Sequence, residues 1–293
     1  LSECVIGDVR DRKRVEHIFR SFTPDIVFHA AAYKHVPLME DNPYEAVGVN
    51  VLGTRNMADM AVAFGSEKFV MVSTDKAVNP TNVMGATKRC AEIYTQTLGR
   101  SPQCNTHFIT TRFGNVLGSN GSVIPIFRKQ IQNGGPITVT HRDITRYFMT
   151  IPEACNLVLE AGSMGKGGEI FVFDMGESVK IYDLAKKMIK LSGLTLGRDI
   201  EIIEIGLRPG EKLYEELLAN KENTINTYHP KIMIAQTESY KMAEVEVALQ
   251  NLHLAHQQCH NLNMVRSLKN LVPEFISNNS IYGELDLKQV ENE

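Results

Sequence analysis

The amino-acid sequence predicts an α/β fold built on a parallel, doubly wound sheet, and two observations carry that prediction. Over the first 175 residues, short apolar strands alternate with amphipathic helices, which is the pattern of strands joined by helical crossovers. Hydrophobic residues make up 43% of the 293 residues, so the chain can bury a sizeable core. Beyond Gly176 the alternation becomes irregular, and we expect a smaller lobe there.

Periodicity and turn residues place the individual elements. In the first helix, Val15, Phe19 and Phe22 fall on one apolar stripe. Residues 25–30 then form an apolar run of the kind found in buried strands. The expected elements are, in chain order, helix 11–22, strand 25–30, helix 43–64, strand 68–73, helix 83–98, strand 107–112, helix 152–161, strand 169–174, and helices 181–191, 241–252 and 261–272. Residues 1–8 have the character of a strand in mid-domain and lack an initiator Met, so we expect a fragment of a longer chain.

Composition excludes several classes of protein. Lys and Arg total 31 against 34 Asp and Glu, a net charge of -3 without the basic excess of nucleic-acid-binding proteins. No apolar run approaches the roughly 18 residues that a membrane span requires. The five cysteines are scattered without a C-x-x-C, which indicates reduced thiols in a cytosolic compartment. His29, His107 and His141 share no ligand spacing with another His or Cys, so no metal is assigned.

Four polar residues stand where the strand 68–73 ends. They are Ser73, Thr74, Asp75 and Lys76. Ligands of open α/β sheets bind at the carboxyl ends of the strands. A hydroxyl, a carboxylic acid and an amine at such an end can supply hydrogen bonding, a general acid and a general base. The alternative interpretation is a turn with solvated charges.

Met84 and Lys88 have the spacing of the Tyr-x-x-x-Lys pair of short-chain dehydrogenases, with Met in place of Tyr. In those enzymes the Tyr exchanges a proton with a hydroxyl, while the Lys lowers the pKa of the Tyr and holds the nicotinamide ribose. Taken alone, Met84 and Lys88 are only one face of a helix. Their meaning depends on the motifs around them.

Five short motifs follow one another in a characteristic order. They are Phe28-His29-Ala30-Ala31-Ala32-Tyr33-Lys34-His35-Val36-Pro37, Asn50, Ser73-Thr74-Asp75-Lys76, Met84-Gly85-Ala86-Thr87-Lys88 and Arg112-Phe113-Gly114-Asn115-Val116. Together they resemble extended short-chain dehydrogenase/reductases, and more closely the UDP-N-acetylglucosamine 4,6-dehydratases of capsule and O-antigen biosynthesis. Within these, the chain is similar to the long, membrane-anchored branch that carries Met at the Tyr position. The resemblance covers residues 5–220.

The resemblance implies a role for individual residues. Thr74 and Lys88 match the hydroxyl and the lysine of the catalytic triad, and Asp75 and Lys76 match the acid and the base of the elimination. The positions that match cofactor-binding residues are Asp8, Val9, Ala30, Ala31, Ala32, Lys34, Asn50 and Lys88. The positions that match UDP-sugar-binding residues are Asn115, Val123, Arg146, Arg208 and Glu211. Close packing at Ala30–Ala32 and surface ion pairs at Arg146 and Arg208 are the alternatives.

The resemblance also implies a domain division and a reaction. Residues 1–175 form a Rossmann-type dinucleotide-binding domain, with a substrate-contacting segment at about 115–150, and residues 176–293 form a smaller substrate-binding lobe with C-terminal helices. The cofactor is NADP, with NAD as the alternative, tightly bound and recycled. Oxidation at carbon 4 acidifies the carbon 5 proton, which Lys76 removes while Asp75 protonates the departing carbon 6 hydroxyl. Hydride return then gives a 4-keto-6-deoxy sugar, and the cycle requires that Lys76 is neutral and Asp75 protonated at least part of the time.

Other parts of such an enzyme are expected outside this sequence. The Gly-rich loop and the first two strands, which bind the pyrophosphate, have no counterpart in it, nor do the membrane helices of the long branch. We therefore expect a soluble fragment from the cytoplasmic side of a protein anchored in the bacterial inner membrane. The helix 43–64 is the candidate for pairing subunits in a homo-oligomer.

Two alternative functions stay open. A UDP-sugar 4-epimerase of the same superfamily would share the fold, but it needs no acid/base pair for elimination, so Asp75 and Lys76 argue against it. A non-catalytic nucleotide-sugar-binding lobe is favoured by Met84 and by the absence of the Gly-rich loop. The joint presence of Thr74, Asp75, Lys76 and Lys88 argues against this second alternative.

Overall fold

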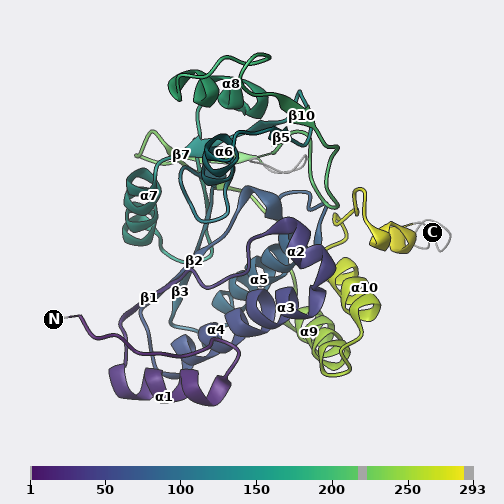
Figure 1. The fold of residues 1–293 in the computed structure, drawn as a ribbon. Coiled ribbons are helices and arrows are strands. Elements are labelled where there is room, and N and C mark those ends of the chain that lie inside the picture. Colours follow the sequence, from purple (N-terminus) through teal and green to yellow (C-terminus); the bar gives the residue numbers. More distant parts are fainter. Residues whose placement is uncertain (1, 217–222, 287–293) are drawn as a thin grey trace.

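The main sheet confirms the predicted α/β class. The computed structural model describes residues 2–216 and 223–286 (Figure 1). Within them, the sheet has the strand order β1-β2-β3-β8-β12-β11. β1, β2, β3 and β8 are mutually parallel, whereas β12 runs antiparallel to β8 and β11 antiparallel to β12. The strands of this sheet are β1 (Ile26–His29), β2 (Lys68–Val72), β3 (His107–Arg112), β8 (Ile170–Phe173), β11 (Thr224–Asn226) and β12 (Ile232–Ala235).

Helices cover both faces of the sheet (Figure 1). The helices are α1 (Arg12–Phe22), α2 (Val36–Asp41), α3 (Pro43–Ala46), the π-helical η1 (Val47–Gly53), α4 (Thr54–Ala63), the 3₁₀ turn η2 (Asp75–Ala77), α5 (Val83–Gly99), α6 (Val123–Gln132), α7 (Ile151–Met164), α8 (Ile181–Leu191), α9 (Met242–Gln257), α10 (Asn261–Leu271) and the 3₁₀ turn η3 (Ile281–Gly283). Short strands complete the chain: β4 (Asn115–Val116), β5 (Ile137–Val139), β6 (Thr145–Arg146), β7 (Phe148–Met149), β9 (Val179–Lys180) and β10 (Ile202–Glu204).

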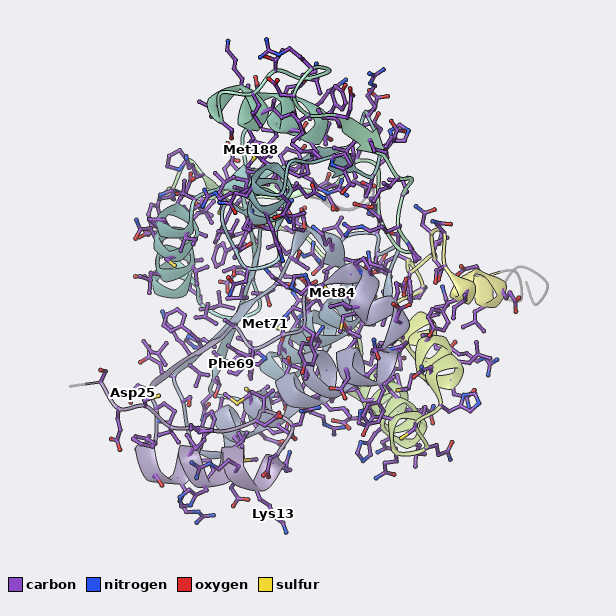
Figure 2. The ribbon with its side chains drawn as sticks, viewed as in Figure 1. Lys13, Asp25, Phe69, Met71, Met84 and Met188 are labelled. Atoms are coloured by element: carbon purple, nitrogen blue, oxygen red, sulfur yellow. The ribbon has the colours of Figure 1, made fainter. Side chains whose placement is uncertain are left out.

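Strand β2 shows why both faces are buried. Phe69 and Met71 pack into the core formed with α4, α5, α9 and α10, whereas Val70 packs into a second core under α7. All three side chains are fully buried, as expected for a strand whose residues alternate between two covered faces. Figure 2 shows Phe69, Met71 and Met84 in the interior and Lys13 at the surface.

Side-chain caps fix the starts of α5, which lines the site, and of α1. The Asn82 side chain accepts a hydrogen bond of 2.8 Å from the Gly85 N–H and so begins α5. Asp11 caps α1 in the same way through the Arg14 N–H. The start of α5 is therefore set by local sequence, and α5 carries Met84 and Lys88 in its first two turns.

The expected helix 43–64 is not one regular α-helix. Its middle, Val47–Gly53, is π-helical and lies between α3 and α4. Such segments often occur at functional positions, and this one carries Asn50. Helix α9 packs beside η1, and Tyr44 of α3 stacks there on His256 of α9 with ring centroids 4.0 Å apart.

The start of the chain corrects one expectation. Residues 2–7 form no strand and join no sheet in the described structure, and β1 pairs only with β2. Asp8 instead binds Arg10 of the following turn, and Asn56 of α4 donates to the Val9 carbonyl at 3.0 Å. An apolar run becomes a strand only where a neighbouring strand accepts its backbone hydrogen bonds.

Residues on both sides of position 175, the expected boundary, share one apolar cluster. A smaller core unites Phe127 of α6, Ile137 of β5 and Ile189 of α8, so residues 123–139 and 181–204 make the smaller lobe. β11, β12, α9 and α10 return to the main body, where β12 extends the sheet beyond β8 and α10 packs on α5. β12 pairs with the edge of β8, which would otherwise be open, and α10 covers the apolar face of α5. No helix within the described residues is both long and apolar enough to span a bilayer.

Candidate functional site

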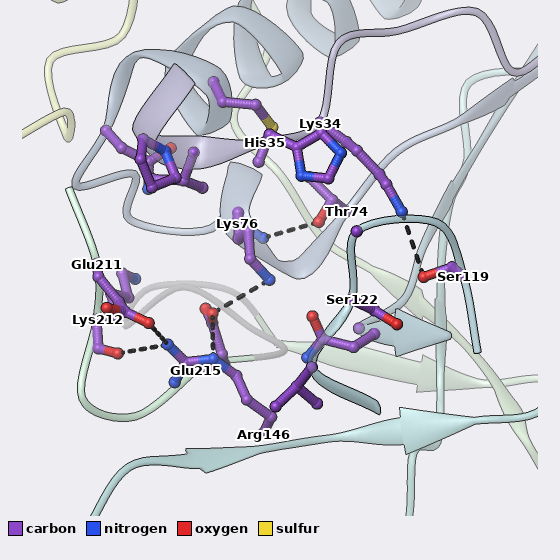
Figure 3. Close-up of a pocket in the computed structure, with 18 of the residues that line it drawn as sticks. Lys34, His35, Thr74, Lys76, Ser119, Ser122, Arg146, Glu211, Lys212 and Glu215 are labelled. Carbon is purple, nitrogen blue, oxygen red and sulfur yellow. Dashed lines mark hydrogen bonds and ion pairs between the residues drawn. The ribbon is translucent and has the colours of Figure 1, made fainter. Parts of the chain in front are cut away.

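A cavity of about 490 Å³ lies where the carboxyl ends of β1, β2 and β3 meet the smaller lobe (Figure 3). It brings together most of the residues that the sequence singled out. Those lining it are Ala30, Ala32, Lys34, Thr74, Lys76, Met84, Lys88, Asn115, Val123, Arg146, Arg208 and Glu211. The position at the carboxyl edge of parallel strands is where ligands bind in this class of fold.

Asp75 and Lys76 occupy the turn η2 directly after β2. The Asp75 N–H donates to the carbonyl of Phe113 at 3.1 Å, which ties the turn to the end of β3. Gly114 makes room for the carboxyl, because a Cβ at that position would lie 3.0 Å from Asp75 Oδ2. Thr74 Oγ1 donates to Asp75 Oδ1 at 2.9 Å and Lys76 Nζ donates to the same oxygen at 3.0 Å.

The surroundings of the Asp75 carboxyl favour its protonated form. Its side chain is fully buried, and Oδ2 has no hydrogen-bond partner among the described residues. Burial raises the pKa of Asp75 above its ordinary value, and the Glu215 carboxylate adds to this effect, while Lys76 opposes it. The direction agrees with the expectation of a protonated Asp75.

The surroundings of Lys76 favour its charged form. Its ammonium lies 3.0 Å from Asp75 Oδ1 and 3.1 Å from Glu215 Oε1. Burial alone lowers the pKa of Lys76, but the attraction of Asp75 and Glu215 outweighs burial, so the net pKa is raised. Lys76 is therefore held in its charged form in this structure.

Glu215 is the site residue that the sequence reasoning missed. It follows β10 far along the chain from η2, and its side chain is only 2% exposed. Burial raises the pKa of Glu215, yet the attraction of Lys76 and Arg146 outweighs burial and lowers it below the ordinary value. No local pattern links Glu215 to Lys76; the nearest sequence signal is its closeness to the Arg208-Pro209-Gly210 turn.

Arg146 lies in the pocket but its guanidinium is occupied by the chain itself. Nη1 donates to the carbonyls of Thr145 and Leu213, and Nη2 donates to the Lys212 carbonyl at 2.9 Å and to Glu211 Oε1 at 3.2 Å. Nε lies 3.4 Å from Glu215 Oε1. Arg146 therefore anchors residues 211–215 at the pocket wall (Figure 3).

The Arg208 side chain, which also lines the cavity, is more exposed than that of Arg146. It is 51% exposed and contacts Glu211 Oε1 at 3.3 Å. Glu211 also contacts Arg146, so it links the two arginines. A planar guanidinium at a half-exposed pocket rim is suited to a phosphate group.

Met84 and Lys88 lie on the wall formed by α5. Both are nearly fully buried as residues and both line the cavity. Burial lowers the pKa of the Lys88 ammonium to about 8, against the opposing attraction of Glu92. Glu92 is itself held by Arg112, at 2.7 Å from Nη2, and by the Ser73 hydroxyl at 2.6 Å.

Four of the expected cofactor-binding residues do not line this cavity. Asn50 is fully buried behind it, where its amide accepts from the Tyr33 N–H at 2.8 Å and donates to the Tyr33 carbonyl and to Thr87. Asn50 thus holds the backbone after β1 in place. Ala31 is not among the lining residues, and Asp8 and Val9 lie beside η1 and α4 outside the cavity. Among the described residues, no group of three His, Cys, Asp or Glu is arranged to hold a metal ion.

Comparison with known proteins identifies relatives of this chain. A family described as "Polysaccharide biosynthesis protein" matches residues 1–237. The chain is 54% identical over 248 residues to the capsular polysaccharide biosynthesis protein CapD of Staphylococcus aureus, and 57% identical over 231 residues to a probable polysaccharide biosynthesis protein, EpsC, of Bacillus subtilis. These matches cover 85% and 79% of this chain but only 41% and 38% of the relatives, so the chain spans about two fifths of their length.

Other relatives carry two different activities in their names. A UDP-N-acetylglucosamine 4,6-dehydratase (inverting) of Campylobacter jejuni is 36% identical over 82% of this chain and 69% of its own length. A UDP-glucose 4-epimerase of Rickettsia canadensis is 42% identical over 74% of this chain and 62% of its own length. Among solved structures, Pen from Bacillus thuringiensis matches with a TM-score of 0.74 and 40% identity, covering 81% of this chain and 73% of that one.

Proposed function

Because this chain belongs to the polysaccharide biosynthesis protein family, an extended short-chain dehydrogenase/reductase group, we propose that its pocket is the active site of a UDP-N-acetylglucosamine 4,6-dehydratase. The observation that carries the proposal is the Asp75–Lys76 pair on one buried turn at the carboxyl end of β2. An acid and a base on adjacent residues can remove one proton and deliver another on the same substrate. The product would be a UDP-4-keto-6-deoxy sugar for surface polysaccharide synthesis.

The two residues divide the elimination between them. Lys76 accepts the carbon 5 proton, Asp75 gives its proton to the carbon 6 hydroxyl, and the carbon 6–oxygen bond breaks as the carbon 5–carbon 6 double bond forms. Asp75 is poised for its part, since burial raises its pKa. Lys76 must first lose the proton that Asp75 and Glu215 stabilise on it.

The residues lining the pocket fit the nicotinamide end of a dinucleotide. Ala30 and Ala32 present only methyl groups to the cavity wall, and Met84 and Lys88 line the same space from α5. When bound, a nicotinamide cofactor supplies the acceptance and return of a hydride. Lys88, with a pKa lowered to about 8, would hold the cofactor ribose and the Thr74 hydroxyl would orient the sugar. We propose NADP, with NAD as the alternative.

A 4-epimerase is the second candidate, because a relative of that name shares 42% identity with the chain. An epimerase also oxidises carbon 4, but it loses no water and needs no acid at carbon 6. The buried Asp75–Lys76 pair has no task in that reaction, which favours the dehydratase.

Incubation of the full-length protein with UDP-N-acetylglucosamine, followed by mass spectrometry, tests the proposal. Loss of water supports a dehydratase, an epimer of unchanged mass indicates an epimerase, and binding without conversion indicates a non-catalytic lobe. Lys76→Met and Asp75→Asn should each lower dehydration by about 10²–10⁴-fold. In heavy water, Asp75→Asn should retain deuterium exchange at carbon 5 and Lys76→Met should lose it. Lys129→Met, at an exposed lysine of α6 outside the cavity, is the matched control.

A further inference from the structure

We propose that Glu215 is a positioning residue of this site, which forms an ion pair with Lys76 and joins the turn η2 to the wall segment 211–215. The inference deepens the proposed function and rests on it for its catalytic consequence.

The contacts of Glu215 place it between two cations. Oε1 lies 3.1 Å from Lys76 Nζ and 3.4 Å from Arg146 Nε. The side chain of Glu215 is 2% exposed, that of Lys76 17% and that of Arg146 11%. Figure 3 shows Glu215 between Lys76 and Arg146. Oε2 is buried and has no hydrogen-bond partner among the described residues. Oε1 therefore contacts both cations, while Oε2 accepts no hydrogen bond from the described residues.

The charges that face Lys76 come from three elements. η2 contributes Asp75, β6 contributes Arg146, and the segment after β10 contributes Glu215 together with Lys212 and Glu211 behind it. Asp75 and Glu215 both attract the Lys76 ammonium, at 3.0 Å and 3.1 Å, and Glu215 is the partner that comes from outside the turn η2.

Removal of this carboxylate should release the lysine proton at lower pH. In Glu215→Gln, Lys76 keeps its contact with Asp75 but loses its second carboxylate, while Arg146 still repels its charge and burial still disfavours it. An opposite charge at such a distance shifts a pKa by about 1–3 units, so the Lys76 pKa should fall by about that amount. Under the proposed mechanism Lys76 acts in its neutral form, and the rising limb of turnover against pH should move to lower pH by the same amount.

Direct titration of Lys76 in the full-length protein tests the inference without relying on turnover. Lysine labelled with carbon-13 at Cε is incorporated during growth, and the Lys76 resonance is assigned by its disappearance in Lys76→Arg. The expected result is a lower Lys76 pKa in Glu215→Gln, a smaller decrease in Glu215→Asp, and no change in Glu216→Gln. Glu216 is the matched control, because it is adjacent in sequence but binds Asn79 and Lys212 instead of Lys76.

The possible outcomes separate the inference from the proposed function. An unchanged Lys76 pKa in Glu215→Gln overturns the positioning role. A lowered pKa in a protein that releases no water from UDP-N-acetylglucosamine keeps the positioning role and rejects the dehydratase. If Glu215→Gln does not fold, as judged by circular dichroism, Glu215→Asp carries the test, and a Lys76 pKa equal to that of the wild type then overturns the inference.

Discussion

Gly85, in the first turn of α5, is a residue at which the neighbouring backbone leaves no room for a side chain. A Cβ built there would lie 2.1 Å from the Lys76 carbonyl oxygen and 3.0 Å from the Lys76 carbonyl carbon, both of which are backbone atoms. Ordinary contact begins at 3.4 Å, so Gly85→Ala requires η2 and α5 to separate by about 1.3 Å. The substitution therefore acts on the catalytic turn without removing any functional group.

The magnitude follows from two opposing effects. Alanine in place of glycine inside a helix contributes about 1 kcal/mol of stability. Overpacking against an unyielding neighbour costs roughly 1–3 kcal/mol, and backbone at 2.1 Å indicates the upper end. We expect a net loss of about 2 kcal/mol in the free energy of unfolding. Displacement of a catalytic group by about 1 Å can lower turnover by about 10²-fold.

Urea denaturation and a dehydration assay on the full-length protein measure both effects. Gly99→Ala is the control, since Gly99 ends the same helix and its Cβ would meet only the Phe108 side chain, at 3.1 Å. The control should keep its turnover and change the free energy of unfolding by less than about 1 kcal/mol. A Gly85→Ala protein with the stability and turnover of the wild type would refute the close approach of α5 and η2.

Three further predictions concern other parts of the site. Met84→Leu should retain turnover within about tenfold, because it conserves volume in a buried wall and a thioether cannot act as a base; a thousand-fold loss would give Met84 a chemical role. Arg208→Lys should weaken UDP-sugar binding by about 1–3 kcal/mol in calorimetry, since a lysine cannot make a bidentate contact, and unchanged affinity would place Arg208 outside the binding site. Glu92→Gln should lower the free energy of unfolding by roughly 3–5 kcal/mol, because it leaves the buried Arg112 and Arg89 charges without their carboxylate. Burial opposes ionisation of Glu92, but the attraction of Arg112 outweighs burial and lowers the pKa of Glu92 in the folded protein. The loss of unfolding free energy in Glu92→Gln should therefore be complete above pH 4.5, the ordinary pKa value. It should become smaller as the pH falls below that value, which acid titrations of stability measure.

The sequence by itself determined the fold class, and most of the candidate residues that it indicated line one cavity. Apolar runs and helical stripes set the strands β2 and β3 and the helices α1, α5 and α8 to within a residue or two of their expected bounds. The polar residues after β2 and the Met84–Lys88 pair identified the pocket, because parallel strands end at one edge and helix starts are fixed by local caps.

The tertiary structure alone decided which contacts form between residues that are far apart in the sequence. Residues 2–7 lack a strand partner, so their apolar character does not suffice to make them a strand. The sequence predicts Asn50 at the pocket, yet its side-chain amide is hydrogen-bonded to Tyr33 and Thr87. Arg146 likewise looks like a phosphate clamp, but the backbone of residues 212–213 occupies its donors. Lys76 is attracted by its sequence neighbour Asp75 and also by Glu215, which no local pattern connects to it. Electrostatic energy depends on distance in space and on burial, and not on separation along the chain.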